Sequence, residues 1–141
     1  ITKIEARNLQ QLEEKYLEIV PGKTEWNHIY TIFLGSGIAA NKTACTHLLK
    51  EWDNEWQKSP NVLLSLCPEN PKELYKIKNI PAGAAGQEMN LLAEQNKEKY
   101  SGQICETPID YLRAKQQQED KITLYRVTIE NGNLKIMTDE L

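Results

Sequence analysis

The dipeptide Asn131-Gly132 is the feature that most restricts how this chain can fold. It separates two segments in which apolar and polar residues alternate, Ile122–Ile129 and Leu134–Thr138. Asn-Gly in that setting is the strongest short-range signal for a β-hairpin with a two-residue turn. We therefore expect a hairpin over residues 121–138. The residues expected on its buried face are Tyr125, Val127, Ile129, Leu134 and Ile136.

Before the hairpin, apolar residues recur mainly at the three- and four-residue spacings of amphipathic helices, and prolines and glycines divide the segments. The helices predicted in this way span residues 2–20, 24–34, 41–57, 87–100 and 107–118. The short apolar run Val62–Cys67 fits a buried strand, and periodicity alone does not separate that reading from a buried helical turn. The predicted fold class is α+β: a single, mainly helical domain over residues 1–141, with about five helices and a C-terminal β-hairpin.

Charge and hydropathy exclude two broad classes of protein. The formal net charge is −3, whereas domains that coat nucleic acid through bulk charge are strongly basic. Any contact with nucleic acid must therefore come from a locally basic face. No apolar stretch is long enough to cross a bilayer, so no membrane partner is expected.

Three cysteines, Cys45, Cys67 and Cys105, are widely spaced and fit no metal-binding pattern. Because their number is odd, we expect reduced thiols rather than a complete disulfide framework, and hence a cytoplasmic location. No metal or other cofactor is predicted. The chain begins at Ile1 rather than Met, so we expect that it was processed or is a piece of a longer protein.

The strongest functional lead is a helix-turn-helix over residues 24–57. The helices predicted at 24–34 and 41–57 are joined through a short segment that contains Gly35 and Gly37. The second helix of such a motif contacts DNA near its N-terminal end, on the side away from its apolar stripe. The residues predicted to contact phosphates or base edges there are Asn41, Lys42, Thr43, Thr46, His47 and Lys50. Arg126 and Lys135, which point outward from the hairpin, are predicted to contact a second phosphate strand.

This segment resembles the helix-turn-helix segments of plasmid-type DNA-binding proteins. In those segments a Leu-Gly turn precedes a helix that ends in residues like Leu-Leu-Lys-Glu-Trp. The corresponding residues are Leu34-Gly35 and Leu48–Trp52. The resemblance covers a small part of the chain and uses common residue types, so it assigns no family. The competing structural interpretation is that two consecutive amphipathic helices simply build a core.

A phosphate-binding loop is a second interpretation of the same residues. It requires a strand, a glycine-rich loop and then Lys-Thr at the start of a helix. Lys42-Thr43 is present, but Asn41 stands where that motif needs glycine, and Gly35 and Gly37 fit neither spacing. The sequence therefore favours the helix-turn-helix.

We accordingly expect a small, non-enzymatic regulatory or accessory protein that binds double-stranded DNA. It is expected to dimerise through the N-terminal helix, whose apolar residues are Leu9, Leu12, Tyr16 and Ile19. The alternative is a protein–protein adaptor or inhibitor, with Trp56 as the exposed anchor for the partner. A third class, an enzyme whose site forms only in the fold, has no support from any catalytic motif, and no catalytic residue is predicted.

Overall fold

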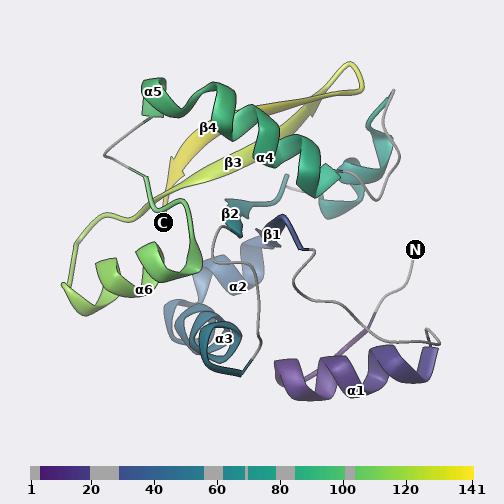
Figure 1. The fold of residues 1–141 in the computed structure, drawn as a ribbon, viewed down its shortest axis with the longest axis vertical. Coiled ribbons are helices and arrows are strands. Elements are labelled where there is room, and N and C mark those ends of the chain that lie inside the picture. The colour runs from purple at the N-terminus through teal and green to yellow at the C-terminus, as the bar shows by residue number, and fades with distance from the viewer. Residues whose placement is uncertain (1–3, 20–28, 56–61, 69, 79–84, 101–103) are drawn as a thin grey trace.

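The structure, a computed structural model, describes residues 4–19, 29–55, 62–68, 70–78, 85–100 and 104–141. Its centre is one four-stranded sheet in the order β1-β2-β3-β4 (Figure 1). The strands are β1 (Thr31–Leu34), β2 (Leu63–Leu66), β3 (Thr123–Glu130) and β4 (Asn133–Glu140). The first three are mutually parallel, and β4 is antiparallel to β3. The predicted α+β fold is confirmed.

Helices cover both faces of the sheet. On one face lies α4 (Ala85–Gln95), whose Met89 and Ala93 pack against Tyr125 and Val127. It is followed by the single turn α5 (Lys97–Tyr100), and the 3-10 helix η2 (Pro71–Lys76) precedes it. On the other face α2 (Ser36–Ala40), α3 (Lys42–Glu55) and α6 (Pro108–Gln116) enclose a second apolar cluster (Figure 1). With both faces covered, β2 is buried along its whole length, as is typical of a central parallel strand.

The predicted hairpin is confirmed in its register. Val127 lies opposite Ile136, and Ile129 opposite Leu134. Asn131 and Gly132 both have positive φ angles, which a tight two-residue hairpin turn requires. The predicted inner face packs on α4, with Tyr125, Val127 and Leu134 buried and Ile129 and Ile136 partly buried.

Three other predicted helices are confirmed with shifted bounds. The helix at 41–57 is α3, the helix at 107–118 is α6, and the segment 87–100 forms α4 and α5 with a turn between them. Thr107 caps α6 through a capping box with Asp110. The apolar run Val62–Cys67 contains strand β2. The N-terminal helix, predicted over 2–20, is α1 (Leu9–Ile19), so the prediction of helix over residues 4–8 is wrong.

The helix predicted over 24–34 is wrong at its C-terminal end, because Thr31–Leu34 form strand β1 and Ile29 and Tyr30 are not helical. Residues 24–28 lie outside the described residues. The physical reason is the partner: β1 pairs in parallel with Leu63–Leu66, far along the chain, and local periodicity carries no information about that pairing. The predicted helix-turn-helix therefore loses the end of its first helix. The element that precedes α3 is the five-residue helix α2.

Candidate nucleic-acid interface

Helix α3 separates an apolar side from a polar side. Cys45, Leu49 and Trp52 face the interior and are at most 5% exposed. Asn41 caps the helix, since its Oδ1 accepts the N–H of Ala44 at 3.0 Å. The solvent-facing side of residues 42–50 carries Lys42, Thr43, His47 and Lys50, all exposed, and the half-buried Thr46. These five residues, with Asn41, are the ones the sequence predicted to contact DNA.

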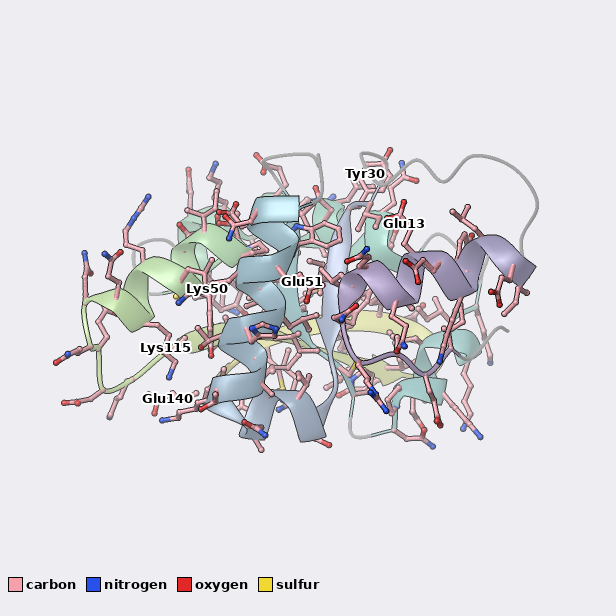
Figure 2. The ribbon with its side chains drawn as sticks, turned by 90° about the horizontal axis from the view of Figure 1, so that it is seen from below. Glu13, Tyr30, Lys50, Glu51, Lys115 and Glu140 are labelled. Carbon is pink, nitrogen blue, oxygen red and sulfur yellow. The ribbon has the colours of Figure 1, made fainter. Side chains whose placement is uncertain are left out.

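The structure brings these five side chains together with one from another helix. Lys42, Thr43, Thr46, His47, Lys50 and, from α6, Lys115 line a single shallow depression of about 450 Å³. We call these six residues the α3–α6 basic surface. Figure 2 shows Lys50 and Lys115 on the neighbouring helices, on the side of α3 away from α1.

The three lysines of this surface have no carboxylate partner within ion-pair distance in the described part of the chain. Three positive charges therefore lie around one depression of an acidic protein. Such an arrangement attracts anions, and the threonine hydroxyls add donors that suit phosphate oxygens.

Tyr111 holds α6 against α3 beneath this surface. Its side chain is completely buried, and Lys115 Nζ lies 5.9 Å from the centre of its ring. Burial is the main cause that raises the pKa of Tyr111 to about 12, so the phenol is neutral at physiological pH. Its hydroxyl lies near Thr46 and Cys45 but has no partner in hydrogen-bonding geometry among the described residues.

The acidic residue that follows Lys50 in α3 reaches the basic surface through His47. Glu51 is buried on the side of α3 that faces α1 (Figure 2). Its Oε1 accepts the backbone N–H groups of Leu9 at 2.6 Å and Gln10 at 3.3 Å. Its Oε2 lies 4.0 Å from His47 Nε2. The positive end of the α1 dipole thus stabilises the negative charge of this carboxylate. Glu51 does not line the basic surface.

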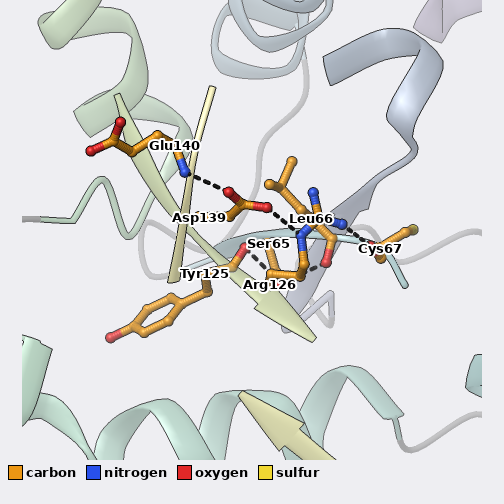
Figure 3. Close-up of polar contacts among 7 residues, drawn as sticks. All are labelled: Ser65, Leu66, Cys67, Tyr125, Arg126, Asp139 and Glu140. Carbon is orange, nitrogen blue, oxygen red and sulfur yellow. Dashed lines mark hydrogen bonds and ion pairs between the residues drawn. The ribbon is translucent and has the colours of Figure 1, made fainter. Parts of the chain in front are cut away.

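The two hairpin residues predicted to contact DNA do not line this depression. Arg126 bonds Asp139 Oδ2 at 2.8 Å through Nε and the Cys67 carbonyl at 2.7 Å through its terminal nitrogen (Figure 3). Lys135 pairs with Glu130 at 2.7 Å. Both cations therefore already have partners within the chain.

Trp56 and the N-terminal helix were the two places predicted to contact a partner protein. Trp56 lies outside the described residues. In the N-terminal helix, Leu9 and Leu12 pack against Trp52 and Val62 within the chain, whereas Ile19 is 55% exposed. Much of the apolar stripe proposed for dimerisation is thus used intramolecularly.

Lys115 was not among the residues predicted to contact DNA. The usable signal was the pair Tyr111 and Ala114, which marks the buried side of α6 and places Lys115 at its border. Which helix α6 packs against is a tertiary contact that no local pattern reveals.

The strand that a phosphate-binding loop requires is present, because β1 runs directly into Gly35 and α2. Lys42 and Thr43, however, begin the separate helix α3 rather than α2, the helix that follows Gly35. They therefore have no part in a loop of that type.

The three thiols and Tyr125 have pKa values raised by burial. Burial, followed by the charge of Asp110, raises the pKa of Cys105 to about 11, so this thiol is protonated and a poor nucleophile at neutral pH. Burial also raises the pKa of Cys45 and of Cys67. Tyr125 donates its hydroxyl to Glu106 at 3.1 Å, and burial with this carboxylate raises the pKa of Tyr125. Among the described residues no group of three metal-ligating side chains is placed to hold an ion.

Comparison with protein-family models, curated proteins and solved structures finds no match for this chain. No described helix is long and apolar enough to span a membrane.

Proposed function

We propose that this chain is a non-enzymatic accessory or regulatory protein that binds double-stranded DNA through the α3–α6 basic surface. The observation that carries the proposal is the convergence of Lys42, Lys50 and Lys115 on one depression, without carboxylate partners in the described residues. Because these lysines have no carboxylate partner there, binding to phosphate breaks no ion pair within the described part of the chain.

The spacing of the charges suits a duplex. Lys42 and Lys50 lie two helical turns apart, which is about 12 Å along the axis of α3. The major groove of B-DNA has a similar width, about 12 Å. A helix crossing the groove at this point would set one lysine near each phosphate strand, with Thr43 and Thr46 between them. Lys115 would add a third phosphate contact from α6.

Three phosphate contacts predict a modest salt dependence. Each neutralised phosphate contributes about −0.9 to the slope of log binding constant against log salt, so the expected slope is about −3. Binding should be measurable near 50 mM salt and weaker by roughly 50-fold near 200 mM.

The test is fluorescence anisotropy with a labelled mixed-sequence duplex at those two salt concentrations. The double variant Lys42→Glu/Lys50→Glu should lose binding, and Lys115→Glu should weaken it. The matched control is Lys72→Glu/Lys99→Glu, which makes the same change in net charge at two exposed lysines outside the basic surface. If both double variants weaken binding equally, the effect is one of bulk charge and the α3–α6 basic surface is not the interface.

The competing proposal is a protein–protein adaptor. The observation in its favour is that Leu17 and Ile19, at the end of α1, are 45% and 55% exposed. Absence of binding at the lower salt concentration would reject the DNA proposal in favour of the adaptor. The chain would then be used as bait for a protein partner. The variant Leu17→Ser/Ile19→Ser should no longer capture that partner.

A further inference from the structure

Among the described strands, β4 forms one edge of the sheet, so half of its backbone groups have no strand beside them. Leu141 donates its N–H to the Ile122 carbonyl at 2.9 Å, which fixes the alternation of the β3–β4 ladder. Residues 133, 135, 137 and 139 therefore turn their N–H and C=O groups toward β3. The groups of Leu134, Ile136 and Thr138 point away from the sheet. The next outward N–H, that of Glu140, is bonded to the side chain of Asp139 at 2.9 Å (Figure 3).

Edge strands are usually protected from pairing by prolines, bulges, short length or repelling charges. Strand β4 has eight residues, no proline and an unbroken register with β3. Its charges are also not of one sign. Lys135 and Asp139 lie two residues on either side of Met137, on the same face of the strand.

We propose that β4 pairs with β4 of a second copy of this chain, antiparallel and about a two-fold axis at Met137. In this register each Lys135 lies opposite Asp139 of the other copy, and Met137 lies opposite its own counterpart. Ile136 and Thr138, whose backbone groups point outward, become mutually hydrogen-bonded partners. The result is a continuous eight-stranded sheet.

The charge pattern selects this register among those that the backbone permits. Moving the axis to Ile136 places Lys135 opposite Met137 of the other copy, and moving it further toward the hairpin turn places Lys135 opposite Lys135. Only the axis at Met137 sets two opposite-charge pairs across the interface. Within one chain Lys135 and Asp139 already contact Glu130 and Arg126. In the Lys135–Glu130 pair both side chains are 59% exposed, so this ion pair is weak. Lys135 can therefore also contact Asp139 of the other copy.

Met137 gives the interface an apolar centre. Its side chain is 48% exposed on the face of the sheet that carries Arg126 and Lys135. Pairing two copies would cover this side chain with its counterpart. Because the rest of the contact is main-chain hydrogen bonds and rim charges, we expect a reversible dimer rather than an obligate one.

The test is sedimentation equilibrium of the full chain over about 10 µM to 1 mM. The wild-type chain should shift from its monomer mass of 16.2 kDa toward twice that mass. Met137→Glu and Met137→Lys, each alone, place like charges opposite each other and should weaken dimerisation by at least about tenfold. An equimolar mixture of the two variants should restore the dimer, because the new charges are then opposite in sign.

Two further variants keep the result interpretable. Thr138→Pro removes an outward N–H that the β3–β4 ladder does not use, so it should abolish dimerisation while the circular dichroism spectrum is retained. Leu91→Glu changes an exposed apolar residue of α4 in the same way as Met137→Glu and should leave the dimer intact. A wild-type chain that stays monomeric, or a variant mixture that stays monomeric, would overturn the proposal. DNA binding is not needed for either result, so this inference stands apart from the proposed function.

Discussion

Glu51 shows how one side chain can join two distant parts of the chain. Its carboxylate accepts the N–H groups of Leu9 and Gln10, which are otherwise unpaired donors at the start of α1. Asn8 accepts the N–H of Gln11 at 2.7 Å, so the first turn of α1 is satisfied from two sides. This explains why α1 begins at Leu9 rather than at residue 2.

Glu51→Ala should lower the free energy of unfolding by about 2 kcal/mol, since it leaves buried donors without an acceptor. Urea denaturation followed by tryptophan fluorescence measures this change. Hydrogen exchange at Leu9 and Gln10 should speed up in the same variant. Glu51→Gln keeps an acceptor oxygen and should cost about half as much. Equal stability of Glu51→Ala and wild type would show that α1 does not dock through this carboxylate.

At the scale of elements, the hairpin turn can be tested by comparing Gly132, whose backbone conformation favours glycine, with Gly37, whose conformation does not. Gly132 has φ of +78°, and an added Cβ would lie 2.5 Å from the Lys78 side chain. Gly37 lies in α2, has no such φ, and has open space around an added Cβ. Gly132→Ala should therefore destabilise the chain by about 1 to 2 kcal/mol, whereas Gly37→Ala should stabilise it by about 0.5 kcal/mol.

Thermal unfolding of both variants beside the wild type measures these effects. Changes of the same sign would contradict the assignment of Gly132 to a left-handed turn position. The Lys78 N–H donates to the Gly132 carbonyl at 2.7 Å, so the turn is also held by the segment that follows η2. We therefore expect Gly132→Ala to disturb the segment after η2 as well as the hairpin.

At the scale of the whole molecule, the sequence predicts what local patterns encode. The Asn131-Gly132 hairpin, the capped helix α6 and the polar side of α3 all follow from spacing within a few residues. Strand β1 and Lys115 were missed for one shared reason. Thr31–Leu34 become a strand only because Leu63–Leu66 lie beside them, and Lys115 joins the basic surface only because Tyr111 packs α6 on α3. Parallel strand pairing and helix packing depend on residues far apart in the sequence. These long-range contacts determine which residues form the basic surface.

Because several thiols and phenols are buried in the core, the free energy of unfolding should fall at alkaline pH. Burial raises the pKa of Cys105 from its ordinary 9.0 to about 11 and that of Tyr111 from 10.0 to about 12. An acid whose pKa is raised by folding contributes full stability below its unfolded pKa and loses it as the pH rises through the folded pKa. Stability should therefore be constant up to about pH 8.5 and fall between about pH 9 and pH 12.

Each of these two groups contributes up to about 3 kcal/mol over that range, at about 1.36 kcal/mol per pKa unit. Urea midpoints measured at intervals across the range should show the fall. Cys105→Ala removes one of the three thiols whose contribution is lost from about pH 9, so its stability should decline less between pH 9 and 11 than that of the wild type. A parallel decline in both proteins would show that this thiol gains no protection from folding. The alkaline transition would then come from Cys45, Cys67 and the tyrosines, whose pKa values are also raised by burial.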